Sequence, residues 1–289
     1  MASMGDIKHS IRSISETEQI TRAMKLISTS KMRKAISRFE SNSAYFARVQ
    51  SSIKDILLHS RGQDINHPYI GESAGDRAAF IVVAADKGLC GGYNHNVLAL
   101  AHEHIRKAQT PHIFAVGQET RAFLDRKGLD YDPAFLHMSQ IPALRTARSI
   151  ASGVFKLFEE GIAGEAYIVY THFISVLRQE PRVLKLLPVS LSDLNDIKTE
   201  AQYVAQMKYH PSPKEVFDTL IPQYITGLIY GCMVQSYASE QCARMTAMEN
   251  ATKNAEEMIE KLTMDYNRAR QQAITKEISE IMGALEALK

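Results

Sequence analysis

The chain has 289 residues, more than a usual single domain, so we expect one large folding unit or two smaller ones. With 45% hydrophobic and 23% charged residues and a net charge of only +2, it is typical of a globular protein, and its overall charge does not indicate a nucleic-acid binder. The three cysteines form no CxxC pair and are odd in number, which argues against a secreted disulfide framework.

The first sixty residues predict one long helix. Ser3 and Asp6 form a helix-start signal, and no glycine or proline occurs between Gly5 and Gly62. A helix of about 55 residues would be roughly 80 Å long. Its apolar positions follow a coiled-coil spacing, with a looser stretch after Ile14 and polar residues in two slots, Ser28 and Asn42. The apolar members are Ile7, Ile11, Ile14, Met32, Ala35, Phe39, Phe46, Val49, Ile53 and Ile56.

This first helix is also basic over its first forty residues. A solvated helix face and a contact with an acidic partner explain that charge about equally well. The cations are Lys8, Arg12, Arg22, Lys25, Lys31, Arg33, Lys34 and Arg38.

Residues 76–209 predict a central α/β domain, which follows a linker over 61–75. Short apolar runs rich in β-branched residues alternate with helical windows, a pattern typical of a mostly parallel sheet. The predicted strands are 78–85, 112–117 and 166–173, with 182–190 and 202–210 as further strands that could be antiparallel at an edge. The predicted helices are 96–109, 119–128 and 143–161.

A glycine-rich loop follows the first of these strands, at the strand-to-helix position where parallel sheets usually bind ligands. It contains Asp86, Lys87, Gly88, Leu89, Cys90, Gly91 and Gly92. Neither the GxxxxGK[ST] spacing nor the GxGxxG spacing is present. Three interpretations stay open: a phosphate-binding loop, a plain tight turn, and a loop that contacts another protein. Cys90 has no base fixed beside it and is expected to be a buried or contact residue.

A metal site is not expected among the histidines that follow. His102 and His104 lie two apart on a helix, so their side chains diverge by about 200°. With His95 they fit a solvated helix face better than a ligand set.

The C-terminal segment, 210–289, predicts a second and longer helix. Beginning near Pro213, it could run for about 75 residues, or roughly 110 Å. Its stretch from Thr219 to Ser239 carries no charge and is nearly long enough to span a bilayer, but proline, glycine and glutamine dilute its hydropathy, so we expect protein to bury it. A heptad seam follows at Met245, Met248, Thr252, Ala255, Ile259, Leu262, Tyr266, Ala269 and Ala273.

If the two terminal helices pair antiparallel, the second one extends beyond the first by about 20 residues, or roughly 30 Å. A new apolar stripe begins there, at Ile274, Ile278, Ile281, Leu285 and Leu288. An uncovered stripe of this kind is typical of a surface that binds another chain. Self-pairing in a homodimer and a frayed tail are the alternatives.

Three long motifs resemble the gamma subunits of F-type ATP synthases, of the bacterial type. They are the opening DIKHSIRSISETEQITRAMKLISTSKMRKA, the loop DKGLCGGYN, and the closing stretch from ASEQCARMTAMEN to EISEIMGALEAL. The resemblance covers both ends and the middle of the chain.

The resemblance implies a noncatalytic rotor shaft: an antiparallel coiled coil of the two arms and a Rossmann-like α/β domain that no longer binds nucleotide. The longer helix would rise into a ring of alpha and beta subunits, so that its rotation couples ion flow through the membrane sector to ATP synthesis or hydrolysis. Contacts with the beta subunit would come from Met24, Lys25, Arg244, Arg270, Gln271, Thr275 and Glu277. Ile278, Ile281, Leu285 and Leu288 would form an apolar bearing tip, and residues 86–92 a loop facing the beta and epsilon subunits.

The resemblance also implies partners and a location. Besides alpha, beta and epsilon, the partners include the c-subunit ring, with no nucleic acid and no direct insertion into the membrane. ATP, ADP and magnesium would bind on the alpha and beta subunits, with no cofactor on this chain. The resemblance implies a peripheral protein on the cytoplasmic side of a bacterial inner membrane. The lack of an apolar secretory signal predicts no export, and the lack of an Arg/Ser-rich transit peptide favours a bacterial protein over a mitochondrial one.

Two other functions remain compatible with the residues themselves. One is a nucleotide-binding α/β enzyme with a coiled-coil module, and the other is a homodimeric coiled-coil adaptor. In the adaptor, the arms would pair between chains and not within one chain.

Overall fold

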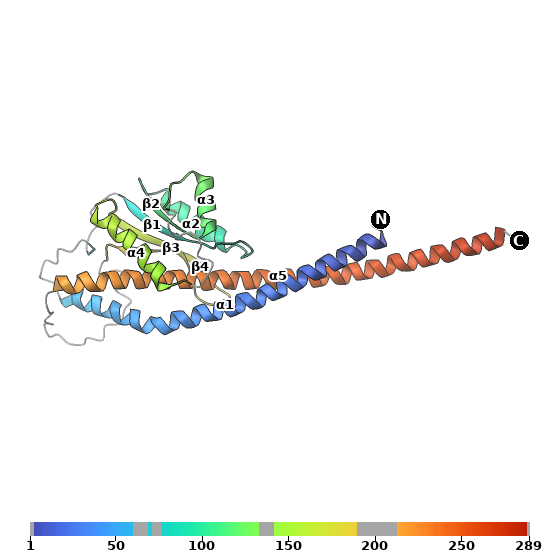
Figure 1. Ribbon diagram of the computed structural model, residues 1–289, viewed down its shortest axis with the longest axis horizontal. Coiled ribbons are helices and arrows are strands. Elements are labelled where there is room, and N and C mark those ends of the chain that lie inside the picture. The colour runs from blue at the N-terminus through green and yellow to red at the C-terminus, as the bar shows by residue number, and fades with distance from the viewer. Residues whose placement is uncertain (1–2, 60–68, 71–76, 133–141, 190–212, 288–289) are drawn as a thin grey trace. The chain divides into compact units, whose positions relative to one another are not determined.

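The computed structural model describes residues 3–59, 69–70, 77–132, 142–189 and 213–287 (Figure 1). The chain divides into two compact units, one made of Met1–Ser28 with Arg244–Lys289 and the other of Thr29–Ala243. The strand predicted over 202–210 and most of the predicted linker lie outside the described residues, and the four-segment division of the chain stays a prediction.

The second unit contains a four-stranded sheet in the order β2-β1-β3-β4. The strands are β1 (Ala78–Val83), β2 (His112–Val116), β3 (Glu165–Phe173) and β4 (Gln179–Leu187). β1 pairs in parallel with both β2 and β3, while β4 is an antiparallel edge strand beside β3. The mostly parallel sheet predicted from the sequence is therefore confirmed.

Helices cover both faces of this sheet. α2 (Tyr93–Ile105) and α3 (Gln118–Lys127) pack on one face, and α4 (Leu144–Glu159) packs on the other face together with the long helix α5 (Pro213–Ala287). Because alternate residues of a strand point to opposite faces, Phe80 and Val82 of β1 join one apolar cluster and Ile81 joins the other. A strand that is buried on both sides explains the unbroken apolar run in this part of the sequence.

The two predicted terminal helices are present almost residue for residue: α1 spans Met4–His59 and α5 spans Pro213–Ala287. The start of α1 has the expected reciprocal cap: the Asp6 backbone N–H donates to Ser3 Oγ at 3.2 Å, and the Ser3 N–H donates to Asp6 Oδ2 at 3.0 Å. Both helices contribute residues to both units.

The uncharged stretch of α5 is buried by protein, as the sequence predicts. Ile221, Ile225 and Ile229 are fully buried, and they belong to the same apolar cluster as α4 and the sheet. Within the described part of the chain, no helix combines the length and the apolar character needed to cross a membrane.

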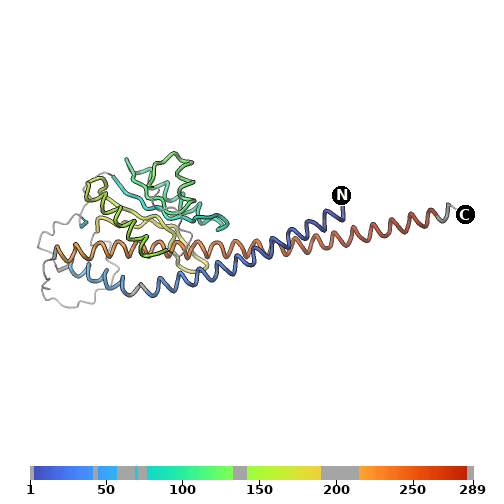
Figure 2. The backbone as a smooth tube through the Cα atoms, in the orientation of Figure 1, coloured from blue at the N-terminus to red at the C-terminus, as the bar shows by residue number. Residues whose placement is uncertain are grey.

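The first unit is an antiparallel pair of helical segments, residues 4–28 of α1 against residues 244–287 of α5 (Figures 1 and 2). Every predicted seam position of α5 from Met245 to Ala273 is buried or half-buried. Thr21 and Thr252 face each other across the pair, with their hydroxyl oxygens 2.8 Å apart. Counted by heptads from that contact, Met4 lies opposite Ala269, so residues 270–287 extend past α1, close to the overhang predicted from the sequence.

Candidate functional site

Four consecutive seam positions of α1 in the first unit are polar. The four-three spacing continues without a break from Ile14 through Glu18, Thr21 and Lys25 to Ser28. Glu18, Thr21 and Ser28 are 9%, 8% and 2% exposed, as buried as apolar seam residues. The stretch after Ile14 that the sequence suggests to be looser is therefore a continuous part of the heptad seam, with polar residues at the seam positions. The unbroken four-three spacing is the sequence signal that could have identified these positions.

The centre of this polar seam is a pair of buried hydroxyls. Thr21 Oγ1 and Thr252 Oγ1 lie 2.8 Å apart. Each can also donate within its own helix, Thr21 to the Glu18 carbonyl at 2.9 Å and Thr252 to the Met248 carbonyl at 2.8 Å. Two hydroxyl hydrogens serve three contacts, so one hydroxyl donates across the seam while the other keeps its intrahelical bond.

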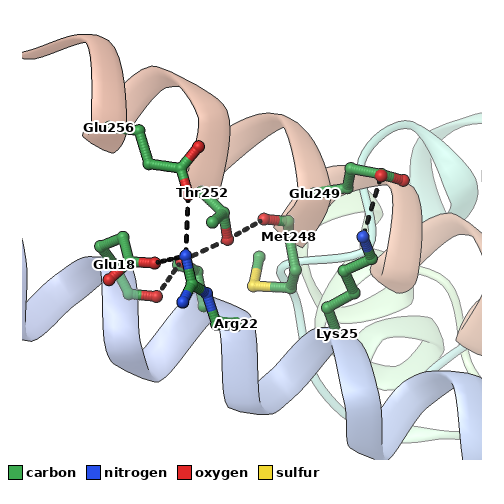
Figure 3. A network of polar contacts seen from close by, with 8 residues as sticks. Glu18, Arg22, Lys25, Met248, Glu249, Thr252 and Glu256 are labelled. Atoms are coloured by element: carbon green, nitrogen blue, oxygen red, sulfur yellow. Dashed lines mark hydrogen bonds and ion pairs between the residues drawn. The ribbon is translucent and has the colours of Figure 1, made fainter.

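Interhelical ion pairs lie on either side of the hydroxyl pair (Figure 3). Arg22 Nη2 lies 2.7 Å from Glu18 Oε1 and 2.8 Å from Glu256 Oε1, and Lys25 Nζ lies 2.9 Å from Glu249 Oε1. The hydrogen bond from Lys25 lowers the pKa of the Glu249 carboxyl below its ordinary value. In both interhelical pairs the cation belongs to α1 and the anion to α5, so the basic character of α1 is partly neutralised within the chain.

The residues that the resemblance assigns to the beta-subunit contact fall into two groups. Met24 is half-buried, the Lys25 ammonium is paired with Glu249, and Arg244 is only 8% exposed. These three side chains are therefore partly or largely engaged within the chain, whereas Ile20 and Leu26 of α1 are 60% and 67% exposed. Whether any of them contacts a beta subunit stays a prediction.

The second group lies on the part of α5 that extends past α1. Arg270, Gln271, Thr275 and Glu277 are all exposed there, and the Thr275 hydroxyl donates to the Gln271 carbonyl at 2.9 Å. The structure brings these four residues together within two helical turns.

The predicted apolar tip continues this exposed segment. Ile278 and Ile281 are 56% and 61% exposed. Leu285 lies on α5 with its side chain outside the described set, and Leu288 lies outside the described residues altogether. The described part of the stripe thus has no covering side chains from this unit.

The glycine-rich loop leads from β1 into α2 through two left-handed residues, Leu89 with φ 62° and Gly91 with φ 56°. This reversal turns Cys90 inward, where it is 1% exposed and packs in one small apolar cluster with Ala85 and Tyr93. The outer rim is left to Lys87, Gly88, Leu89, Gly91 and Gly92, all of which are exposed.

Tyr93 anchors the loop to α5 within the second unit. Its hydroxyl lies 2.9 Å from Ser236 Oγ, which also accepts the Thr171 backbone N–H at 3.2 Å. Complete burial raises the pKa of the Tyr93 phenol, so the group stays a neutral hydrogen-bonding partner. Three elements, α2, β3 and α5, therefore meet at one hydroxyl.

The loop uses its own polar groups for internal bonds. The Tyr93 N–H, the first of α2, donates to the Cys90 carbonyl at 3.2 Å, and Asp86 Oδ1 accepts the Gln118 N–H at 3.1 Å. The hollow beside it, lined by Asn96 and Gln179 among others, has a volume of about 160 Å³. Typical small-molecule sites measure roughly 300–1,000 Å³. Of the three open interpretations, this geometry favours a tight turn with an exposed rim.

Among the described residues, no group of three or more His, Cys, Asp or Glu side chains could hold a metal ion. His102 packs edge-on against Phe123, with ring centroids 5.8 Å apart, and burial lowers its pKa. Cys90, Cys232 and Cys242 are all free and buried. Burial raises the pKa of the Cys232 and Cys242 thiols.

The family model for ATP synthase matches residues 3–288 of this chain. Among curated relatives, the ATP synthase gamma chain of Ruminiclostridium cellulolyticum is 45% identical, with 99% of both chains covered. That of Acetivibrio thermocellus is 41% identical over the whole of both chains. The chain belongs to the ATP synthase gamma-chain family. The bacterial gamma-subunit resemblance seen in the sequence is thereby confirmed.

Solved structures of ATP synthases share the fold of this family member. A chain from the Euglena gracilis mitochondrial ATP synthase, in an assembly named OSCP/F1/c-ring, matches with a TM-score of 0.65 at 16% identity, covering 99% of this chain and 94% of that one. A chain from the Tetrahymena thermophila mitochondrial ATP synthase, titled central stalk/c-ring, matches with a TM-score of 0.60 at 23% identity, covering 80% and 99%. At these identities the likeness concerns the fold.

Proposed function

We propose that this chain is the central-stalk rotor subunit of an ATP synthase, an asymmetric shaft whose rotation inside a catalytic ring couples ion flow to ATP synthesis or hydrolysis. The single observation that carries the proposal is the bare end of α5: a helix extends past its partner and exposes polar residues from Arg270 to Glu277, followed by Ile278 and Ile281. Because the chain belongs to the ATP synthase gamma-chain family, we infer that this exposed end of α5 inserts into the ring of alpha and beta subunits.

The first unit has the mechanical properties that a shaft needs. Two helices joined along a heptad seam resist bending better than one helix does. The pair has no threefold symmetry, so it presents different faces to three chemically equivalent catalytic subunits and biases each toward a different conformation. Rotation then exchanges binding free energies among the three sites in sequence.

The remaining roles follow from the same proposal. The chain contributes no catalytic group and binds no cofactor, while ATP, ADP and magnesium bind on the alpha and beta subunits. Its partners are the alpha, beta and epsilon subunits and the c-subunit ring, and its location is peripheral, on the cytoplasmic side of a bacterial inner membrane. In support, the loop that follows β1 is filled by Cys90 and Tyr93, which leaves its exposed rim for protein contact.

Reconstitution with alpha and beta subunits of the same organism tests the proposal. The chain is expected to co-purify with them in a complex that hydrolyses ATP, and a bead attached to the second unit is expected to rotate in one direction during hydrolysis. A chain that stays separate from alpha and beta subunits, or a complex in which the bead never turns, contradicts the rotor role.

The two rival functions have their own readouts. In the structure the arms pair within one chain, through Thr21–Thr252 and the ion pairs beside it, which disfavours an adaptor whose arms pair between chains. Mass measurement across concentration is therefore expected to give a monomer. Isothermal titration with ATP and NADH is expected to show no micromolar binding to the isolated chain, and such binding would favour the enzyme.

A further inference from the structure

The turn between β3 and β4 in the second unit exposes apolar side chains. Leu177 is 97% exposed, more than any other large apolar residue in the described part of the chain, and Ile174 and Val176 beside it are 43% and 45% exposed. A single exposed leucine is ordinary on a protein surface. Exposed apolar residues this close together form a small apolar knob.

The backbone of this turn is firmly held. Ser175 Oγ accepts the Leu177 backbone N–H at 3.3 Å, and Gln179 Nε2 lies 2.8 Å from both the Ser175 and the Val176 carbonyl oxygens. The Cys242 thiol of α5 donates to the Val176 carbonyl at 3.2 Å. These bonds fix the turn without covering the Leu177 side chain, so a partner that contacts it has little backbone ordering to impose.

A second exposed leucine lies in the glycine-rich loop. Leu89 is 66% exposed and has φ 62°, a left-handed conformation that leucine rarely adopts. The loop around it is well fixed, since Asn94 Oδ1 accepts the Ala85 N–H at 3.0 Å. Glycine would fit this backbone with less strain. Because the Leu89 side chain gains little burial in return, its conformation indicates a functional position and not a folding requirement.

The two turns border one hollow of the second unit. Its lining includes Gly92 of the glycine-rich loop, Gln179 at the start of β4 and Ala243 of α5. Gly92 is three residues from Leu89, and Gln179 is two residues from Leu177. The two leucines therefore lie on neighbouring, independently fixed turns.

The charged side chains of these two turns are mainly basic. Lys87, Arg178 and Arg182 are exposed, whereas Asp86 and Glu180 are half-buried. Glu180 is also paired with both arginines. A complementary partner surface is apolar at its centre and bordered by carboxylates.

The position of the turns on α5 indicates which partner they can meet. Ala243 is the last residue of the second unit on α5, and the helix continues at Arg244 into the first unit. The bond from Cys242 to the β3–β4 turn is therefore made where α5 leaves the second unit. With the first unit inserted into the ring of alpha and beta subunits, the ring is the first partner along α5.

We propose that Leu177, with Leu89 on the neighbouring turn, is an apolar anchor that docks the second unit on the ring of alpha and beta subunits, a step that rests on the rotor function proposed above. The partner surface is an apolar depression with an acidic border. The β3–β4 turn lies outside the three motifs that carry the family resemblance, so it adds a new element to the contact surface.

Competition for the ring tests the anchor. Equal amounts of the parent chain and a variant, distinguished by mass, are mixed with limiting alpha and beta subunits, and the assembled complex is analysed by mass spectrometry. Leu177→Asp is expected to be recovered about tenfold less than the parent chain. Its thermal unfolding midpoint as an isolated chain is expected to stay unchanged, because the side chain is almost fully exposed.

Two further variants serve as controls. Gln109→Asp introduces the same charge at an exposed position beyond the other end of α2 and is expected to compete equally with the parent chain. Leu89→Gly removes a side chain and relieves the left-handed strain, so its midpoint is expected to stay equal or rise while its recovery falls several-fold. A lower midpoint in Leu89→Gly would give Leu89 a folding role and exclude it from the anchor.

The outcomes separate this proposal from the rotor role. If the parent chain is recovered with the ring and Leu177→Asp competes equally, the anchor is wrong and the rotor role stands. If the parent chain itself is not recovered, both are wrong. If Leu177→Asp keeps full recovery on the ring and instead loses binding to the epsilon subunit, the turn docks epsilon and the proposal is overturned.

Discussion

Gly117 shows how closely two strand ends approach each other in the second unit. It lies at the turn from β2 into α3 with φ 93°, and a Cβ built there would come within 2.2 Å of the Ala84 carbonyl oxygen. Beside it, the Ala84 N–H donates to the Val116 carbonyl and the Glu119 N–H to the Ala85 carbonyl, which hold the backbone in place. A side chain at this position therefore cannot be accommodated by a rotamer change.

We expect Gly117→Ala to lower the free energy of unfolding by about 3 kcal/mol, since it combines an unfavourable φ with a backbone overlap. Gly128→Ala is the matched control, because Gly128 has φ 65° but nothing within 4 Å of the added Cβ, and it should cost about 1 kcal/mol. Urea unfolding of both variants measures the difference. Equal losses in the two would show that the overlap is relieved by local movement.

The contact between Ser236 and Tyr93 should tolerate substitution of its two partners unequally. Its hydroxyl serves both Tyr93 and the Thr171 N–H, so Ser236→Ala leaves two buried polar groups without this partner, whereas Tyr93→Phe removes one of the two contacts and keeps the other. We expect about 2 kcal/mol or more of destabilisation for the first and about 1 kcal/mol for the second, by urea unfolding. The reverse order would mean that Tyr93, not Ser236, carries the junction.

At the scale of elements, the helix pair of the first unit carries interhelical ion pairs beside its seam. Lys25 pairs with Glu249 while Thr21 meets Thr252 one turn away, so apolar burial, hydroxyl contact and ion pairing alternate along the same interface. The charges are partly exposed, so each pair contributes modestly and is screened by salt.

Acidification should lower the stability of the helix pair in the first unit. The pKa of Glu249 is lowered in the folded chain by its hydrogen bond with Lys25, from an ordinary value of 4.5. A lowered folded pKa means that the contribution is present above the unfolded pKa and is lost as the pH falls through the folded one. We therefore expect Glu249→Gln to lower the thermal unfolding midpoint at pH 7.

The difference between the variant and the parent chain should shrink as the pH falls through the lowered folded pKa of Glu249, because protonation then removes the same charge from the parent. Circular dichroism melts of the two chains between pH 7 and pH 3 check this. A gap between the midpoints that stays constant across that range would contradict an ionic contribution from Glu249.

At the scale of the whole molecule, folding and function should be separable at the C-terminus. Residues 274–284 of α5 are exposed, and α1 does not reach them by the heptad count. Removing residues 274–289 is therefore expected to leave the thermal unfolding midpoint of the isolated chain within about 1 °C. In the reconstituted complex, the same deletion is expected to weaken the coupling between ATP hydrolysis and ion transport.

A second variant separates the effect of shortening α5 from the effect of removing its apolar tip. The substitutions Ile278→Ser and Ile281→Ser keep the length of α5 and remove only the apolar character of the described tip. If the apolar tip acts as a bearing, this variant should also couple less well. Full coupling in both variants would remove the bearing role from the proposal while leaving the rest of the shaft intact.

The sequence by itself determined the two long helices, the mostly parallel sheet, the heptad seam of α5 and the family. These follow from local signals: the Ser3–Asp6 cap, the absence of helix breakers, and apolar periodicities that hold whatever the neighbouring elements are. Long motifs at both ends of the chain indicated the family before any geometry was known.

Only the tertiary structure decided which polar residues are buried and what each of them faces. Thr21 is a seam residue because Thr252 lies opposite, Lys25 is paired because Glu249 lies within reach, and Gly117 is required because Ala84 approaches it. A polar side chain is buried when a partner from a distant part of the chain satisfies it, and its own residue type does not reveal that partner. Periodicity is a property of one segment, whereas register and polar pairing are properties of two.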